Sequence, residues 1–480
     1  MLKYLIKPWA HQEKAIELSK TQPNLALFFD PGTGKTGTAI NILRLHCMKQ
    51  KRVVPTLILA PIVVLPQWKH EFSIHSKIPQ HQIFVCYEKG PKRLEMIRDA
   101  ISKTKGECII ISNYETLLMD KCFVEFLNWR PEVLIVDESH RCKSPTAKRT
   151  KKVIQLADRA KNKYLLTGTP ITNSPMDIFA QYRILDGGAT FGDNFFVFRS
   201  IWFENVLSGT RATFPKWEIK VHKINDLNRQ IYTKALRAVK SECLDLPPYV
   251  RTRIEVGLSM EQKRLYEEMR KHFITFMDSD HGEKPQAVIA QQAVTKALRL
   301  QQIVTGFVKT EDGNIIRVKD NPRIDALSDL LEDLTINNKV IVWCNFKENY
   351  AQVKDVCQRL NLEFSELTGE TRDRETEIQR FRSDPAVKVL ISNQSAGGVG
   401  INLVEASHAI YYSKTFSLEH DVQSEARNFR GGSNIHEKIT RIDLVAPKTV
   451  DDVITTALEN KQDLISNILE LRKQLENSLI

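Results

Sequence analysis

One short segment near the start of the chain constrains the fold more than any other. The apolar run LALFF leads into the glycine-rich turn DPGTGKT, and a helical pattern follows at once. A strand, a glycine-rich turn and a helix N-terminus surround a phosphate group with backbone amides and the positive end of the helix dipole. We therefore expect Gly32, Thr33 and Gly34 to cradle a nucleoside triphosphate. Lys35 is expected to reach the β- and γ-phosphates, and the Thr36 hydroxyl to coordinate Mg²⁺.

An acidic pair ends a second apolar run, VLIVD. Asp137 and Glu138 lie at the carboxyl end of this predicted buried strand, where parallel α/β sheets place their ligands. Asp137 is expected to hold the metal ion, directly or through water, and Glu138 to orient or deprotonate an attacking water. An Asp-Glu pair alone is more often a charge cluster at a helix N-terminus. The preceding phosphate loop is what favours the nucleotide site.

Apolar, β-branched runs recur in two parts of the chain. They lie at residues 25–29, 56–60, 108–112, 133–137 and 164–168, and again at 339–345, 387–392, 408–413 and 438–445. Such runs, alternating with helical segments, indicate parallel sheets covered by helices on both faces. We expect an α/β protein with a first lobe at 1–185, a helical insertion and interlobe linker at 186–320, and a second lobe with a C-terminal helix at 321–480. The insertion includes a basic segment from about 225 to 243 that we expect to be helical, and the C-terminal helix is expected at 455–478.

The composition is that of a soluble globular protein, with 42% apolar and 26% charged residues. No window reaches the roughly 18 uninterrupted apolar residues of a membrane span, so we expect no membrane partner. The eight cysteines lack metal-ligand spacing and predict reduced, mostly buried thiols.

Positive charge is concentrated in one segment. The chain has 69 Lys plus Arg against 58 Asp plus Glu, a net charge of +11, and residues 141–163 hold nine Lys or Arg and one Asp. This excess invites a polyanionic partner. Lys148, Arg149, Lys151 and Lys152 are candidates for contacts with backbone phosphates. The alternative is a solvated helix face.

Further motifs of the first lobe carry a resemblance to a known family. Their residues are Gln12 in AHQEKAIE, Gln67 and Trp68 in LILAPIVVLPQWKHEF, Asn113 and Tyr114 in ISNYETL, and Thr167, Gly168 and Thr169 in LTGTPITNS. Together with DESHRCKS, which has Ser139 where alanine is common, these motifs resemble those of superfamily 2 helicase-type motors, and among them the Swi/Snf-type ATPases.

The second lobe continues the resemblance. Its motif residues are Gly369 in ELTGETRDRETEIQRF, Ser395, Gly400 and Asn402 in SNQSAGGVGINLVEA, and Gln423, Arg427 and Arg430 in QSEARNFRGG. The chain departs from the family pattern just after Arg430, where Gly431-Gly432-Ser433 replaces the usual Ile-Gly-Gln. We expect this departure to affect the coupling of hydrolysis to movement more than the hydrolysis itself.

The resemblance implies a role for each motif in two RecA-like lobes. It implies that Gln12 reads adenine, and that Arg427 and Arg430 act as arginine fingers on the γ-phosphate when the lobes close. Coupling between the lobes falls to Thr167, Gly168, Thr169, Gly400 and Gln423. The nucleic-acid track falls to Gln67, Trp68, Asn113, Tyr114, Gly369, Ser395 and Asn402. Trp68 and Tyr114 could instead be packing aromatics.

The implied activity is ATP-driven translocation along double-stranded DNA, through phosphate contacts that do not read sequence. One alternative is a helicase that separates DNA or RNA strands with the same motor, and another is an accessory subunit that only binds nucleic acid. We expect a monomer that works with other DNA-processing proteins. The size and the Lys- and Asn-rich composition predict a phage or bacterial source, hence a bacterial or infected-host cytoplasm.

Overall fold

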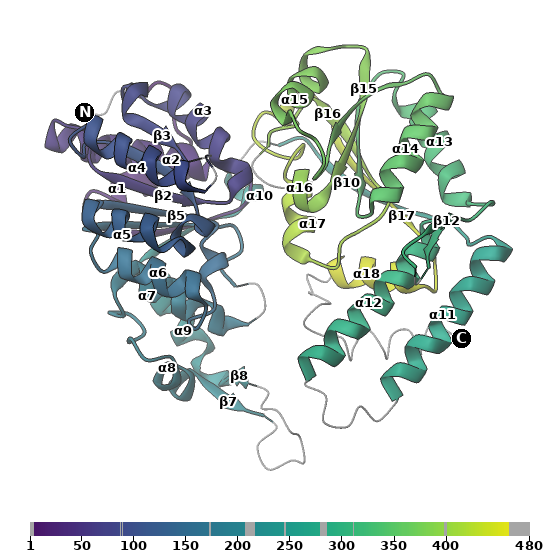
Figure 1. Ribbon diagram of the computed structural model, residues 1–480, viewed down its shortest axis with the longest axis horizontal. Helices are drawn as coiled ribbons and strands as arrows, with labels where there is room; N and C mark the ends of the chain where they lie inside the picture. The colour runs from purple at the N-terminus through teal and green to yellow at the C-terminus, as the bar shows by residue number, and fades with distance from the viewer. Residues whose placement is uncertain are drawn as a thin grey trace. The chain divides into compact units, whose positions relative to one another are not determined.

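The chain forms two compact units, Met1–Asp245 and Leu246–Ile480 (Figure 1). We call them the first and the second unit, and each is described by itself. The computed structural model describes residues 4–86, 88, 90–171, 174–206, 217–243, 246–278, 286–310, 312–397 and 401–459.

The first unit is built on a seven-stranded parallel sheet of order β3-β4-β2-β5-β6-β1-β9. Its strands are β1 (Asn24–Phe29), β2 (Thr56–Ala60), β3 (Ile83–Val85), β4 (Ile109–Asn113), β5 (Val133–Asp137), β6 (Asn162–Leu166) and β9 (Ala235–Ala238). Its helices are α1 (Ala10–Leu18), α2 (Lys35–Gln50), α3 (Leu65–His75), α4 (Pro91–Lys103), α5 (Asp120–Trp129), α6 (Lys148–Ala157), α7 (Ile178–Asp186), α8 (Phe195–Trp202), α9 (Ile224–Ile231) and α10 (Lys240–Cys243). A short antiparallel pair, β7 (Phe203–Asn205) and β8 (Trp217–Ile219), follows α8.

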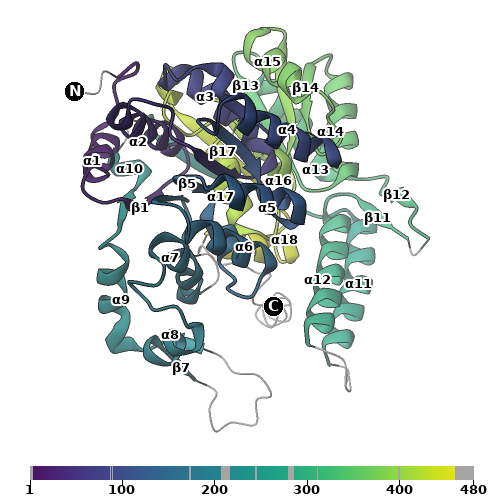
Figure 2. The same ribbon diagram turned by 60° about the vertical axis from the view of Figure 1, so that its left-hand side comes forward.

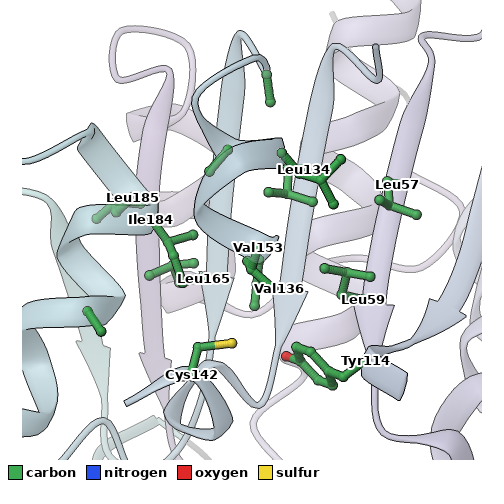
Figure 3. Close-up of a cluster of buried hydrophobic side chains, with 14 of the residues drawn as sticks. Leu57, Leu59, Tyr114, Leu134, Val136, Cys142, Val153, Leu165, Ile184 and Leu185 are labelled. Atoms are coloured by element: carbon green, nitrogen blue, oxygen red, sulfur yellow. The ribbon is translucent and has the colours of Figure 1, made fainter. Parts of the chain in front are cut away.

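The core of the first unit forms because its central strands are apolar on both faces. Every residue of β2 and β5 is buried. Alternate residues point to the same face of a strand, and Figure 3 shows Leu59 of β2 and Val136 of β5 in one cluster of buried side chains, together with Tyr114. Helices cover the sheet and leave its strand ends for the loops that carry polar side chains.

The second unit has a six-stranded parallel sheet of order β10-β17-β16-β13-β15-β14. Its strands are β10 (Tyr249–Glu255), β13 (Lys339–Cys344), β14 (Glu363–Leu367), β15 (Val387–Asn393), β16 (Ala406–Tyr411) and β17 (Ile439–Val445). Its helices are α11 (Met260–Asp278), α12 (Gln286–Val304), α13 (Pro322–Leu334), α14 (Lys347–Arg359), α15 (Arg374–Ser383), α16 (Gln394–Gly397), α17 (Leu418–Glu425) and α18 (Val450–Glu459). Helices α11 and α12 lie side by side (Figure 2), ahead of the hairpin of β11 (Phe307–Lys309) and β12 (Ile315–Arg317).

The predicted fold class is confirmed, because both sheets are parallel and each carries helices. The predicted insertion and interlobe linker at 186–320 is divided between the two units, since the first ends at residue 245 and the second begins at residue 246. It also contributes a strand to each sheet, β9 pairing with β1 and β10 with β17. The C-terminal helix predicted at 455–478 is described as far as Glu459, and its remainder lies outside the described residues.

Strand β9 corrects a specific prediction. We expected a helix from about 225 to 243, but helix α9 ends at Ile231 and the strand ALRA follows. Alanine, leucine and arginine favour helices. The open edge of β1 supplies hydrogen bonds that outweigh this preference, and Leu27 pairs there with Leu236. Tertiary pairing therefore decides the conformation of this segment.

Candidate active site

The predicted phosphate loop lies between the end of β1 and the start of α2. Gly34 is the N-cap of α2 with φ of 80°, and Gly32 has φ of 88°, both in the left-handed region that glycine tolerates. A Cβ on Gly34 would lie only 2.0 Å from Gln12 Nε2, so any other residue there would displace the Gln12 side chain and strain the backbone. The Lys35 ammonium donates a hydrogen bond to the carbonyl of Phe29 at 2.9 Å, across the turn where phosphates are expected.

Gln12, the predicted adenine reader, lies against this loop. Its amide nitrogen donates to the carbonyls of Thr33 at 3.3 Å and Gly34 at 3.2 Å, and its amide oxygen accepts from the Trp9 backbone at 2.8 Å. His11 reaches the Thr33 carbonyl as well, at 2.8 Å. The structure therefore gives Gln12 a direct role in shaping the phosphate loop. Its reading of adenine stays a prediction.

Asp137, the predicted metal ligand, is a buried carboxylate with fixed partners. Its Oδ2 accepts a hydrogen bond from the Trp68 indole at 2.9 Å, and its Oδ1 accepts one from the Glu138 backbone at 3.0 Å. The pKa of Asp137 is raised to about 6, first by burial and then by the Glu138 charge. The Trp68 hydrogen bond and the Lys35 charge act in the opposite direction. A cation at this carboxylate would favour its ionised form.

The donors fit the expected Mg²⁺ in kind. A hydroxyl at Thr36 and a carboxylate at Asp137 are hard oxygen ligands, and Mg²⁺ in phosphate sites uses one or two such side chains and keeps several waters. In keeping with this, the part of the chain that the structure describes contains no cluster of three or more His, Cys, Asp or Glu that could enclose a metal ion by itself.

Glu138, the predicted base, has a strained backbone. Its φ of 52° and ψ of 53° are left-handed, which costs an ordinary residue about 1–2 kcal/mol. Strain of this kind persists where the surroundings hold it. The next two side chains do so: Ser139 donates to Gln181 Oε1 at 2.8 Å, and the His140 ring lies 2.9 Å from the Thr167 hydroxyl. Both are buried.

The loop after β6, which carries the predicted coupling residues, contacts both other motifs of the first unit. Thr167 meets His140, and its hydroxyl also accepts from the Thr169 backbone at 3.1 Å. A Cβ on Gly168 would lie 2.7 Å from Pro31 of the phosphate loop. The carboxyl ends of β1, β5 and β6 meet at one edge of the parallel sheet, so the three predicted motifs form one connected site.

The predicted arginine fingers follow α17 in the second unit. Arg427 is buried and donates to the carbonyls of Gln423 at 2.7 Å and Ile401 at 3.1 Å. Arg430 is half-buried and donates to the same Ile401 carbonyl at 3.3 Å. Both guanidinium groups thus donate to the same acceptor, the Ile401 carbonyl oxygen. Gly400, predicted to couple the lobes, immediately precedes it and lies outside the described residues.

A buried charge cluster fixes α17 to the second sheet. Arg441 of β17 pairs with Asp421 of α17 at 2.9 Å and with Asp443 at 3.0 Å, and lies 3.7 Å over the ring of Tyr411. Lys414 pairs with Asp443 at 3.2 Å. Burial alone would raise the pKa of Asp443, but these cations and Arg251 bring it well below its usual range. Buried charges are stable only when paired in this way, and here they hold the helix that carries Gln423.

Three residues predicted to touch nucleic acid have buried side chains. Trp68 is 1% exposed and binds Asp137, and Tyr114 is fully buried and donates to the Asp137 carbonyl. Asn113 is 4% exposed and caps the short helix that starts at Tyr114, accepting from the Thr116 backbone at 3.3 Å. These contacts fit the packing alternative for both aromatics, and the contact of all three residues with nucleic acid stays a prediction.

The other predicted track residues remain accessible. Gly369 and Ser395 are exposed after the carboxyl ends of β14 and β15, whereas Asn402 and Gln67 are half-buried. Gln67 donates to Glu71 at 2.7 Å, and the Asn402 carbonyl accepts from Arg382 at 2.6 Å. Their contact with nucleic acid stays a prediction.

The basic residues of α6 divide into two kinds. Lys148 and Lys151 are exposed. Arg149 pairs with Glu115 at 3.2 Å and stacks on Tyr114, and Lys152 pairs with Asp120. Only the first two therefore present their charge fully to solvent.

Sequence patterns missed the contacts that join the motifs. Trp68 binds the metal carboxylate, and Gln181 bridges two loops. The signal for Gln181 was present as one amide among the apolar and aromatic residues of the helix segment IFAQY, because a buried polar group needs partners. No comparable signal singles out Trp68. None of the described helices combines the length and apolar character needed to cross a membrane.

Two models of known protein domains match successive parts of the chain. The model of the SNF2-related domain matches residues 11–306, and that of the helicase conserved C-terminal domain matches residues 322–432. The Sulfolobus solfataricus SWI2/SNF2 ATPase core in complex with dsDNA aligns with 99% of this chain and 96% of its own, at 23% identity and a TM-score of 0.45.

Curated relatives are longer proteins. The TATA-binding protein-associated factor mot1 of Aspergillus fumigatus is 25% identical over 92% of this chain and 25% of its own length. Nuclear protein STH1/NPS1 of Saccharomyces cerevisiae is 24% identical over 95% of this chain and 34% of its own length. The Chromodomain-helicase-DNA-binding protein 1-like of Mus musculus is 23% identical over 92% of this chain and 47% of its own length. The chain thus spans a quarter to about half of their lengths. These relatives are eukaryotic and give no support to the expected phage or bacterial source.

The first family model covers more than half of the chain, and the second covers much of the remainder. The chain belongs to the SNF2-related family and is a nucleic-acid-stimulated, ATP-hydrolysing enzyme of the superfamily 2 helicase type.

Proposed function

We propose that this enzyme is an ATP-dependent translocase that moves along double-stranded DNA without reading its sequence. The observation that carries the proposal is the connected site of the first unit. The phosphate loop, the Asp137–Glu138 pair and the Thr167 loop meet at one sheet edge through direct contacts. Such contacts let a change at the nucleotide alter the neighbouring loops.

In the proposed reaction each side chain has one task. Lys35 and the amides of the phosphate loop bind the triphosphate, and Thr36 and Asp137 hold Mg²⁺, which neutralises charge on the phosphates when bound. Glu138 orients the attacking water or accepts its proton. Arg427 and Arg430 stabilise the charge that develops on the γ-phosphate once the second unit closes on the first. Hydrolysis then releases this closure.

Duplex DNA is the proposed track, for two reasons. The relatives of the chain include a chromodomain-helicase-DNA-binding protein. The chain also has a net charge of +11, with Lys148 and Lys151 exposed on α6, as suits phosphate contacts. Strand separation is the alternative outcome of the test below.

Steady-state ATP hydrolysis in the presence of different polymers tests the proposal. We expect blunt duplex DNA to stimulate hydrolysis more than single-stranded DNA or RNA of equal nucleotide concentration. Duplexes of different sequence should stimulate equally, because phosphate contacts position a protein without identifying bases. Stimulation by RNA or single strands alone would assign the enzyme to the strand-separating class.

The salt dependence of DNA binding tests the role of α6. Replacing Lys148 and Lys151 by glutamine should make the slope of log K against log salt shallower by roughly one to two, since each phosphate contact contributes about 0.9. Lys49→Gln with Lys51→Gln is the matched control, because both lysines are exposed at the far end of α2, towards the opposite sheet edge. Equal slopes for the wild type and the α6 variant would show that α6 is a solvated face.

A further inference from the structure

Gln181 is a buried amide within an apolar helix. Its neighbours on α7, Phe179, Ala180 and Tyr182, are buried and apolar or aromatic. The Gln181 amide oxygen accepts a hydrogen bond from the Ser139 hydroxyl at 2.8 Å. Its amide nitrogen donates to the carbonyls of Pro170 at 2.6 Å and Asp177 at 3.0 Å. The side chain thus uses both of its ends inside the protein.

The two ends of this bridge belong to the two loops of the active site. Ser139 directly follows Glu138, and Pro170 ends the Thr-Gly-Thr-Pro turn. Gly168 of this turn lies so close to the phosphate loop that a Cβ added to it would be 2.7 Å from Pro31. The contact between His140 and Thr167 joins the same two loops. One contact leaves a pivot, whereas two contacts fix the orientation of one loop relative to the other.

We infer that Ser139 and Gln181 are positioning residues for ATP hydrolysis. They hold Glu138 in its left-handed backbone conformation and at a fixed orientation to the phosphate loop. The inference rests on the proposed role of Glu138 as the base, and concerns how that carboxylate is aimed. A 1 Å displacement of a reacting group can slow a reaction about a hundredfold, so the aim of the carboxylate governs turnover more than affinity.

Stability alone does not account for this pair. A buried hydroxyl–amide hydrogen bond stabilises a fold little more than apolar groups of the same shape would. What it adds is direction, because a hydrogen bond weakens steeply when its angle departs from linear. The Ser139–Gln181 bridge therefore suits a place where one loop must keep its orientation to another.

The test is a double-mutant cycle on the full chain, with kcat, KM for ATP and thermal stability measured for each variant. Ser139→Ala and Gln181→Leu should each lower kcat about tenfold, with KM changed less than twofold, since either change disconnects Ser139 from Pro170. Ser139→Ala removes the bond to Gln181, whereas Gln181→Leu removes that bond together with those to Pro170 and Asp177. The double variant should match Gln181→Leu, because the bond that Ser139→Ala breaks is already lost there. The double variant removes both polar side chains, so neither position keeps a buried side-chain polar atom that has lost its partner. Its kcat and KM therefore still test the inference if one of the single variants fails to fold.

Ser407→Ala is the matched control. The buried Ser407 hydroxyl donates to the half-buried Asn338 Oδ1 at 2.8 Å near the start of β16, a hydroxyl–amide bond outside the site, and its loss should leave kcat unchanged. Wild-type kcat in folded Ser139→Ala, a rise in KM alone, or single effects that multiply in the double variant would each overturn the inference. Glu138→Gln is measured alongside: full activity there would overturn the assignment of the base, which is a separate result.

Discussion

Glu138→Gln is expected to bind ATP like the wild type and to hydrolyse it at least about 10³-fold more slowly. The glutamine amide cannot accept the proton of the attacking water, and positioned bases contribute about 10²–10⁴ to a rate. Asp137 keeps its hydrogen bonds from Trp68 and from the backbone of residue 138, so the metal site stays in place. Nucleotide affinity and steady-state hydrolysis are measured on the same preparation.

Two further variants delimit this result. Lys35→Ala should abolish hydrolysis and also weaken nucleotide binding, because it removes the cation of the phosphate loop. Glu95→Gln makes the same chemical change at an exposed position of α4 and should leave both quantities unchanged. Hydrolysis near the wild-type rate by Glu138→Gln would remove Glu138 from the role of base.

Arg430→Ala is expected to lower turnover by about 10³-fold or more, with a much smaller change in nucleotide affinity, because a finger acts on charge that develops in the transition state. Arg430 is half-buried, and its guanidinium donates to the Ile401 carbonyl. Because part of its side chain is exposed, we expect the Arg430→Ala variant to remain folded. Turnover and affinity are measured in saturating duplex DNA.

Arg427→Ala should lower turnover as well, but through two effects. Arg427 is buried and ties Gln423 to Ile401, so its loss also loosens the end of α17. We expect lower thermal stability for this variant and an unchanged value for Arg430→Ala. Arg359→Ala, at the exposed end of α14, is the control for charge. A loss of only a few-fold in both arginine variants would contradict their assignment as arginine fingers.

The strands and the phosphate loop could be predicted because their signals are local. Runs such as VLIVD are apolar on both faces, as strands covered by helices on both sides require. Gly34 has a left-handed backbone conformation that favours glycine, and Gln12 packs against it. The glycine-rich pattern of the sequence indicates this backbone conformation directly. Order along the chain then placed the motifs at the carboxyl ends of neighbouring strands.

Features set by distant contacts could not be predicted. Strand β9 forms because β1 has an open edge, whereas its own residues favour a helix. Trp68 and Tyr114 lie in motifs linked to nucleic acid, yet both bind Asp137 and are enclosed by the core. The sequence alone does not distinguish an aromatic residue in a core from one on a binding surface. Only the fold distinguishes the two.

Displacement of a third strand from a DNA triplex tests the central claim most directly. A translocase that follows duplex DNA removes the third strand as it advances, without opening the duplex beneath. We predict displacement that requires ATP and is lost in Glu138→Gln, together with no unwinding of a plain forked duplex by the wild type. Efficient unwinding of the fork, or failure to displace the third strand despite duplex-stimulated hydrolysis, would contradict translocation along double-stranded DNA.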